Sequence, residues 1–236
     1  MRQNYEKCIL GDRCVLVPYR KEHVDRYHKW MLDPDLLEST CSESLSIEEE
    51  YEMQESWRDD ATKCTFIILD RDRVDGLPDH GKESYILRNL PAMVGDVNLF
   101  LSNMEQTEDS TPETDDLSIP LGRQAELDIM IAEKQARGKG IGSEACRMMM
   151  WYGAVELGLK RFFCKINEDN VASLSLFMKL GFLQCAYAKC FKQVEVEIRS
   201  CPTEEMALVL RRVSGGSELS TFNLNDQQNN HGMPSF

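Results

Sequence analysis

The chain has 236 residues, and 27 lysines and arginines stand against 40 aspartates and glutamates, which gives a formal net charge of −13. Hydrophobic residues make up 42% and charged residues 28%, the balance of a soluble globular protein. This acidity argues against a nucleic-acid binder and against docking on an anionic membrane, because both need a surplus of positive charge.

The cysteines and histidines indicate neither a metal site nor a disulfide framework. The nine cysteines are scattered, none has the Cys-x-x-Cys spacing, and there are only four histidines. No apolar run is long enough to cross a membrane, and no apolar segment follows the charged first residues as in a secretory signal. We therefore expect a cytoplasmic protein with reduced thiols.

In the first half of the chain, the pattern predicts strands and helices with a long insertion. A short apolar run at 14–18 predicts a strand, and apolar residues at helical spacing predict a helix over 22–32. Ser46 and Glu49 form a capping box, which opens a second helix. Further β-rich runs follow at 64–69 and 94–101, and the segment 71–92 between them is expected to be an insertion loop.

A second insertion spans 102–124. From residue 102 to 122 it holds six acidic residues and no lysine or arginine. Such a stretch cannot bury enough apolar surface to order itself, which favours a solvated, mobile loop. The alternative is that it serves as a handle for a basic partner or substrate.

The second half alternates strands and helices more regularly. Strands are predicted at 126–132 and 161–166, helices at 141–157 and 170–180, and one or two further strands within 187–199. Gly181 is placed to end the second helix in the left-handed conformation. The polar, low-complexity tail 213–236 is expected to be disordered.

Three glycines, Gly138, Gly140 and Gly142, lie between a predicted strand and a predicted helix. Glycines let several backbone N–H groups converge, and a helix N-terminus adds partial positive charge, so this segment can hold a pyrophosphate. It is not a Walker A loop, because Lys139 is followed by glycine rather than serine or threonine. A dinucleotide fingerprint would need glycine where Ser143 stands.

The segment resembles the acyl-CoA-binding loop of the GCN5-related N-acetyltransferases, whose pattern is met by Gln135-x-x-Gly138-x-Gly140. A second motif of that family follows in order, with Asn170-x-x-Ser173 and then Phe177-x-Lys179-x-Gly181-Phe182. The resemblance extends over 8–200, as one N-acetyltransferase domain interrupted by the two insertions. Further segments, such as Met93–Phe100, are similar to a subgroup close to the ribosomal-protein N-terminal acetyltransferases.

The resemblance implies the α+β acyl-CoA N-acyltransferase fold, a mixed, mostly antiparallel sheet of six or seven strands with helices on both faces. It implies acetyl-CoA as cosubstrate, whose pantetheine arm would pair with the strand 126–132 where that strand splays from its neighbour. The positions that match the family's cofactor-binding residues are Met130, Ile131, Ala132, Arg137, Gly138, Lys139, Gly140, Gly142, Ser143, Asn170, Ser173 and Phe177.

Acetyl transfer to an amine requires that the ammonium first lose a proton. Glu126 and Asp128 are two apart on a strand and hence share one face. Glu126 is our first choice of catalytic base, acting directly or through water, and Asp128 the second. The alternative is that both are ordinary residues on a solvent-facing strand. Phe177 departs from the family, since many members have there a tyrosine that protonates the leaving thiolate.

The sequence thus favours an N-acetyltransferase that acts on a protein or peptide amine by direct attack, without an acyl-enzyme. A second hypothesis is a weakly active or inactive acetyltransferase-like module whose main role is binding. The resemblance points to tubulin or microtubules as that partner, although acidic tubulin would require a local basic face on this acidic chain.

Overall fold

The computed structural model describes residues 1–76, 85–104, 122–199 and 220–223. Within these ranges nine strands form one sheet, in the order β7-β8-β6-β5-β4-β3-β2-β1-β9. Every neighbouring pair is antiparallel except β5 and β6, which are parallel. The strands are β1 (Lys7–Leu10), β2 (Cys14–Pro18), β3 (Lys63–Asp70), β4 (Met93–Asn103), β5 (Arg123–Ile131), β6 (Leu159–Asn167), β7 (Leu183–Ala188), β8 (Gln193–Arg199) and β9 (Ser220–Asn223).

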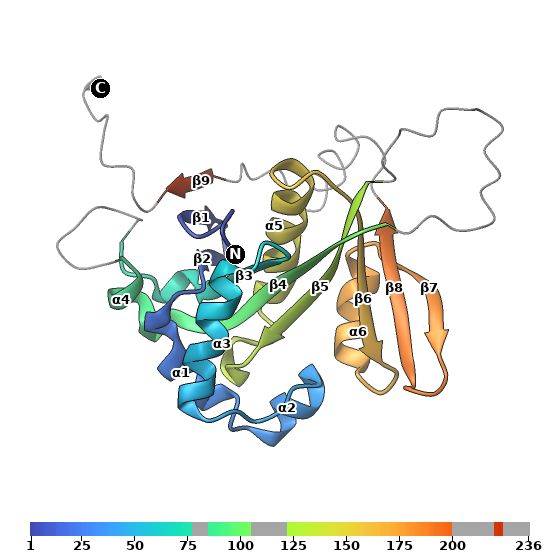
Figure 1. The fold of residues 1–236 in the computed structure, drawn as a ribbon, viewed down its shortest axis with the longest axis horizontal. Coiled ribbons are helices and arrows are strands. Elements are labelled where there is room, and N and C mark those ends of the chain that lie inside the picture. The colour runs from blue at the N-terminus through green and yellow to red at the C-terminus, as the bar shows by residue number, and fades with distance from the viewer. Residues whose placement is uncertain (77–84, 105–121, 200–219, 224–236) are drawn as a thin grey trace.

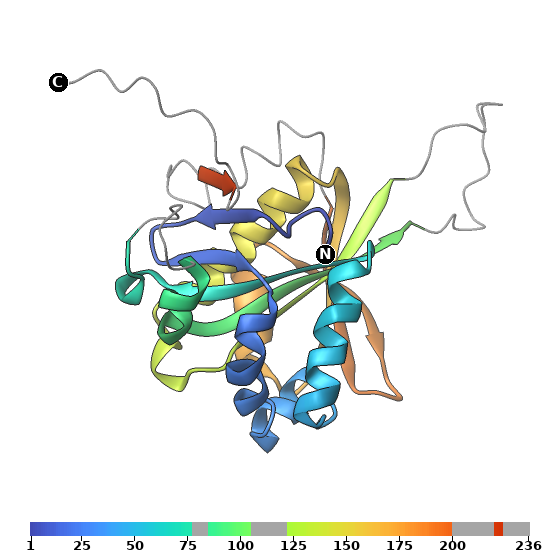
Figure 2. The same cartoon turned by 60° about the vertical axis from the view of Figure 1, so that its left-hand side comes forward.

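Helices cover both faces of this sheet (Figure 1 and Figure 2). They are α1 (Val24–Trp30), α2 (Pro34–Thr40), α3 (Ile47–Asp59), α4 (Tyr85–Asn89), α5 (Ile141–Val155) and α6 (Val171–Lys179). The predicted capping box opens α3, because the Ser46 side chain accepts from the Glu49 N–H and the Glu49 side chain accepts from the Ser46 N–H. Gly181 follows α6 with a φ of 94°, as a left-handed terminator requires.

Two apolar cores lie on the two faces. One packs α5 and α6 on the sheet around residues such as Met149, Phe162 and Phe177. The other packs α1 and α3 on the opposite face, around residues such as Tyr27 and Met130. Because both faces of its centre are covered, seven consecutive residues of β3 are buried.

The α+β fold class is confirmed, but the described residues contain more strands than we expected. The described residues form nine strands rather than six or seven, since β1 and β9 extend one edge and residues 183–199 form a full hairpin. Helix α2 was not predicted. It begins with Pro34 at its first turn and with Asp33 as its N-cap, two signals that the sequence carries.

The structure contains regular elements in two segments that we expected to be irregular, and most of a third segment lies outside the described residues. The segment 71–92 contains the short helix α4, whose Tyr85 and Ile86 are buried, so it is not a loop throughout. In the tail expected to be disordered, Ser220–Asn223 form β9, because the edge of β1 offers backbone hydrogen-bond partners. Residues 105–121 of the acidic insertion lie outside the described residues.

Candidate active site

The parallel strands β5 and β6 pair over only half of their length. Their register runs from Arg123 to Glu126 on β5 and ends at Phe163 on β6. One residue further, the Cys164 thiol donates to the Leu127 carbonyl at 2.8 Å in place of a ladder bond. The strands then diverge, as Figure 1 shows. The second half of β5 therefore has backbone groups on this side without a partner strand.

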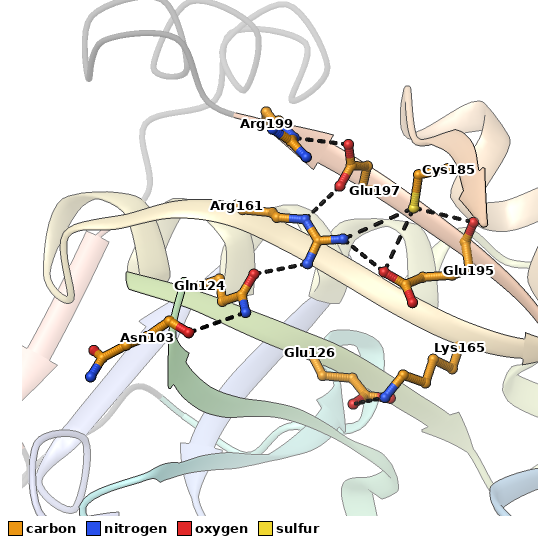
Figure 3. A network of polar contacts seen from close by, with 9 residues as sticks. All are labelled: Asn103, Gln124, Glu126, Arg161, Lys165, Cys185, Glu195, Glu197 and Arg199. Atoms are coloured by element: carbon orange, nitrogen blue, oxygen red, sulfur yellow. Dashed lines mark hydrogen bonds and ion pairs between the residues drawn. The ribbon is translucent and has the colours of Figure 1, made fainter. Parts of the chain in front are cut away.

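A network of charged side chains holds the paired half together (Figure 3). The Arg161 guanidinium on β6 donates to Glu195 at 2.7 Å and to Glu197, both on β8, and to the Gln124 amide oxygen on β5 at 2.8 Å. One arginine thus ties three neighbouring strands immediately before the divergence. The network is half-buried, and several charges share it, so it stabilises the sheet more than an isolated surface pair would.

The predicted glycine loop lies at the far end of β5 and opens α5. Gly138 and Gly140 have φ angles of 75° and 83°, which L side chains rarely adopt, and a Cβ at Gly138 would meet nothing within 4 Å. The first N–H groups of a helix have no partner inside it, and the helix dipole places positive charge there. Loop and helix together offer an open, electropositive backbone surface, which fits a pyrophosphate.

Two side chains anchor this loop to the turn between β1 and β2. The Glu144 carboxylate accepts from the backbone N–H groups of Arg13 at 2.7 Å and Cys14 at 2.8 Å. In return, the Arg13 guanidinium donates to the Lys139 carbonyl at 3.2 Å. Sequence reasoning missed both residues, since nothing in their local pattern shows that residues 12–14 and 139–144 are neighbours.

The other predicted cofactor residues occupy varied positions. Arg137 is exposed but turns back, and its Nε donates to the Ile131 carbonyl at 2.8 Å. Met130 and Ala132 are buried, and Ile131 is half-buried. Gly142 packs against Ile131, which a Cβ at 142 would meet at 3.4 Å. The Ser143 hydroxyl accepts from Arg147 at 2.9 Å.

The second motif forms the start of α6. The Asn170 side chain caps this helix by accepting from the Ser173 N–H at 3.1 Å. Phe177 is buried, and its ring meets the ring of Phe182 edge-on at 5.1 Å. The observed role of the Asn170 side chain is therefore to cap α6.

The two candidate bases lie on the face of β5 that α1 and α3 cover. Glu126 is half-buried and forms an ion pair with Lys165 of β6, with 3.5 Å between Oε2 and Nζ (Figure 3). Asp128 is open to solvent, but the surrounding protein raises its pKa by desolvation, and the charge of Glu126 raises it further. Its Oδ1 accepts from the Ile129 N–H at 2.8 Å.

The structure adds buried polar residues on β4 that sequence reasoning missed. Asp96 and Asn98 lie on the same face as Asp128, and the Asn98 amide donates to Asp96 at 2.7 Å. Burial raises the pKa of Asp96 to about 7, and the charge of Asp128 adds to the rise. Two polar residues within the apolar run 93–101 are the signal that could have found them.

One glycine next to these groups is required by packing. Gly95 on β4 faces Ile131 in the register, and a Cβ at this position would lie 1.9 Å from the Met130 carbonyl oxygen. No side chain fits there. Only glycine lets β4 approach the part of β5 from which β6 has separated.

Comparison with known proteins assigns this arrangement to a class. Residues 13–183 match the family model described as an acetyltransferase (GNAT) domain. The spermidine N-acetyltransferase of Vibrio cholerae, solved with CoA and spermine, has a similar fold, with a TM-score of 0.59 at 15% identity, over 80% of this chain and 96% of that one. The chain belongs to the GNAT acetyltransferase family, and it is an acetyl-CoA-dependent N-acetyltransferase.

Relatives by sequence narrow the assignment. An N-acetyltransferase 9-like protein of Nematostella vectensis is 43% identical over 200 residues, which is 85% of this chain and 89% of the relative. The human protein named alpha/beta-tubulin-N-acetyltransferase 9 is 41% identical over 210 residues, 89% of this chain and 91% of the relative. Within the family, the chain therefore belongs with the N-acetyltransferase 9-like proteins, the subgroup that its sequence resembled.

Proposed function

We propose that this chain transfers the acetyl group of acetyl-CoA directly to a primary amine of a protein, and that tubulin is this protein. The observation that carries this proposal is that strand β5 has both an edge without a partner strand and two carboxylates beside that edge. The edge follows Leu127 on β5, and Glu126 and Asp128 lie beside it. The name of the human relative supports tubulin as substrate. A tubulin substrate would put the reaction in the cytoplasm, and the free thiols of the cysteines within the described ranges are compatible with that compartment.

The chain's residues fit the cosubstrate in the expected places. The loop at Gly138 and Gly140 and the start of α5 would hold the pyrophosphate, and the free edge of β5 at residues 129–131 would pair with the pantetheine arm. Acetyl-CoA supplies a thioester, whose carbonyl carbon is open to attack by an amine. A backbone N–H of the splayed strand would stabilise the charge that develops on the thioester oxygen.

The carboxylates would handle the proton that the amine must lose. A peptide α-ammonium has a pKa near 8 and a lysine side chain near 10.4, so both arrive protonated at neutral pH. Glu126 is proposed to accept this proton, directly or through water, with Asp128 as the second candidate. Lys165 of β6 lies beside Glu126, with 3.5 Å between Nζ and Oε2, so the side chain of the proposed base is held by an ion pair at the point where the strands separate.

A second candidate function is a weakly active module that mainly binds tubulin or microtubules. One observation favours it: Phe177 stands where many relatives in the family place a tyrosine, and it is buried against Phe182. A phenylalanine ring cannot protonate the departing thiolate. The thiol of CoA is acidic enough to leave unaided, so this residue lowers the expected rate without excluding the reaction.

The test is acetylation of purified tubulin, read by mass spectrometry, with wild type and Glu126→Gln compared. Loss of a general base typically lowers the rate 10²- to 10⁴-fold, and the deficit should shrink at high pH, where the amine is already neutral. Acetyl-CoA affinity should stay unchanged. An equal rate in Glu126→Gln would transfer the role to Asp128, and a wild type that acetylates no tubulin amine would contradict the proposal.

A further inference from the structure

A row of polar side chains crosses three strands on the face covered by α1 and α3. Thr65 on β3 pairs with Asn98 on β4, and Asn98 pairs with Asp128 on β5. Asp96 precedes Asn98 by two residues, lies on the same face and pairs with Met130 in the second half of β5. Of these four polar residues, only Asp128 is exposed.

Residues from helices α1 and α3 and from the segment after β2 cover this row on the face of the sheet to which it belongs. Tyr19, which follows β2, is buried, and so is Glu50 of α3. After burial itself, the charges of Glu50 and Asp96 raise the pKa of Tyr19, and the charge of Asp96 raises that of Tyr27 on α1. The two phenols and the two carboxyls therefore lie within electrostatic range of one another, and Tyr19 and Tyr27 pack in the same core as Met130. His28 of α1 lies 3.9 Å from Glu50.

Several polar atoms of this group are buried and have no hydrogen-bond partner among the described residues. They are the Tyr19 hydroxyl, the Thr65 hydroxyl, the side-chain oxygens Glu50 Oε2, Asp96 Oδ1 and Asn98 Oδ1, and the ring nitrogen His28 Nδ1. Leaving such an atom buried and unpaired costs roughly 1–3 kcal/mol. A cluster of them in one place indicates that a ligand or water completes the hydrogen bonds.

The chemistry of the orphan atoms selects the ligand. All of them can accept a hydrogen bond, and the two carboxyl oxygens only accept once Glu50 and Asp96 are ionised, a state that a neighbouring cation favours. The carboxyl of Asp128 lies beside them on β5. The complement is a group with several N–H donors and a positive charge. A chelated metal ion is disfavoured, because in the described ranges no three His, Cys, Asp or Glu side chains gather closely enough to hold one.

We propose that this cluster, which we call the amine chamber and define by Tyr19, Glu50, Thr65, Asp96, Asn98 and Asp128, binds the primary ammonium group of the acceptor. The inference rests on the proposed function and deepens it, since it names the group that recognises the substrate amine. Asp96 and Asn98 would receive the ammonium next to Met130, where the thioester is expected. Asp128, open to solvent, would form the entrance and lead to Glu126.

Asp96 is in this proposal a binding residue and Glu126 the base, so their variants should differ in kinetics. Removing a ground-state contact raises KM, whereas removing a group needed in the transition state lowers kcat. Asp96→Asn should raise KM for the amine substrate at least tenfold and change kcat much less. Glu126→Gln should lower kcat and leave KM nearly unchanged.

A binding experiment tests the chamber without turnover. Two peptides of one tubulin amino-terminal sequence, one with a free amine and one N-acetylated, are titrated by calorimetry into enzyme saturated with CoA. Wild type should prefer the free amine at least tenfold, and Asp96→Asn should lose this preference. The matched control is Asp70→Asn, which removes another buried carboxylate at the far end of β3. It should retain the preference.

Tyr19→Phe guards against a folding defect, because it removes only a hydroxyl that has no partner. It should weaken binding of the free amine and leave the acetylated peptide unaffected. If neither peptide binds wild type, n-butylammonium and n-butanol serve as the probe pair, and equal binding of the two overturns the chamber.

The outcomes separate the two proposals. Equal affinity of wild type for both peptides, or a preference that survives in Asp96→Asn, overturns the chamber, as does a preference that only Glu126→Gln abolishes. In the last two cases acetylation can still occur and the proposed function stands. A wild type that prefers the free amine but acetylates nothing supports the chamber and overturns the proposed function. Water alone in the cluster would give no preference.

Discussion

At the scale of single residues, the molecule keeps carboxylates where burial opposes their charge. Burial raises the pKa of Asp96 to about 7, and it also raises the pKa of Glu50. A fold tolerates such groups when they do something that an apolar residue could not. Perturbed titration of this kind gathers at functional sites more often than elsewhere. This supports a role for β4 that its apolar sequence conceals.

The shifted Asp96 predicts a pH dependence of stability. Its folded pKa of about 7 lies above the value near 3.9 of an unfolded aspartate. The folded state then binds more protons, so the carboxyl stabilises the fold at low pH, and this contribution is lost as the pH rises through the folded pKa. As the pH rises from roughly 4 to 7, the free energy of unfolding of Asp96→Asn should therefore increase relative to that of wild type, by up to about 1.4 kcal/mol per pH unit.

Urea unfolding at a series of pH values measures this difference. The titratable groups that interact with Asp96 are Asp128 on β5, Tyr19 after β2 and Tyr27 on α1, and Glu50 on α3 acts on the same two phenols. His23, whose pKa burial lowers to about 3, has the opposite effect on stability but is present in both proteins and cancels. The stability of Tyr19→Phe should change with pH in the same way as that of wild type, because the phenol of Tyr19 does not titrate in this range. A constant difference between Asp96→Asn and wild type would contradict the prediction.

At the scale of elements, the parts that sequence predicted best are those that local rules determine. The loop from Gly138 to Gly142, the left-handed end of α6 at Gly181 and the capping box of α3 each depend on residues a few positions apart. The divergence of β5 from β6 was expected only through family resemblance, since strand pairing joins distant residues. The Arg161 network and the Glu144 anchor were missed for the same reason.

The glycine loop predicts a specific loss of cofactor. Gly140→Val would place a branched side chain at a φ of 83°, with its Cβ 3.3 Å from the Arg13 side chain and on the surface proposed for the pyrophosphate. Acetyl-CoA binding should fall below detection, while the fold persists. In wild type, acetyl-CoA at 100 times its Kd should add about 2.7 kcal/mol and raise the Tm by roughly 5–11 °C.

Gly158→Val is the matched control for this prediction. Gly158 has a φ of 68° and open space around its Cα, so valine there carries similar backbone strain away from the loop. Its intrinsic stability should drop by about as much, roughly 1–2 kcal/mol. Its Tm shift with acetyl-CoA should equal that of wild type. A normal shift in Gly140→Val would show that the phosphate site lies elsewhere.

At the scale of the whole molecule, the sheet divides two tasks between its faces. The core with α5 and α6 carries the proposed cofactor loop, whereas the face under α1 and α3 carries the carboxylates. The divergence of β5 and β6 lies between these two faces. Among the described residues no helix is long and apolar enough to cross a membrane. The property of the whole chain that bears on a protein partner is its formal net charge of −13.

This charge makes the two candidate functions distinguishable by salt. Tubulin is acidic, so an enzyme that meets it only briefly should be slowed by repulsion. Salt screens that repulsion, since the Debye length falls from about 10 Å at 0.1 M to about 3 Å at 1 M. For the proposed enzyme, moving from about 50 to 300 mM salt should lower KM for intact tubulin severalfold and leave KM for a short, uncharged peptide unchanged. A module that holds microtubules through a local basic face should instead bind more weakly as salt rises. The acetylation assay measures the KM, and co-sedimentation with microtubules at the same salt concentrations measures the binding. If tubulin acetylation slows and microtubule binding weakens together with salt, and Gly140→Val still co-sediments, the binding role is favoured over catalysis.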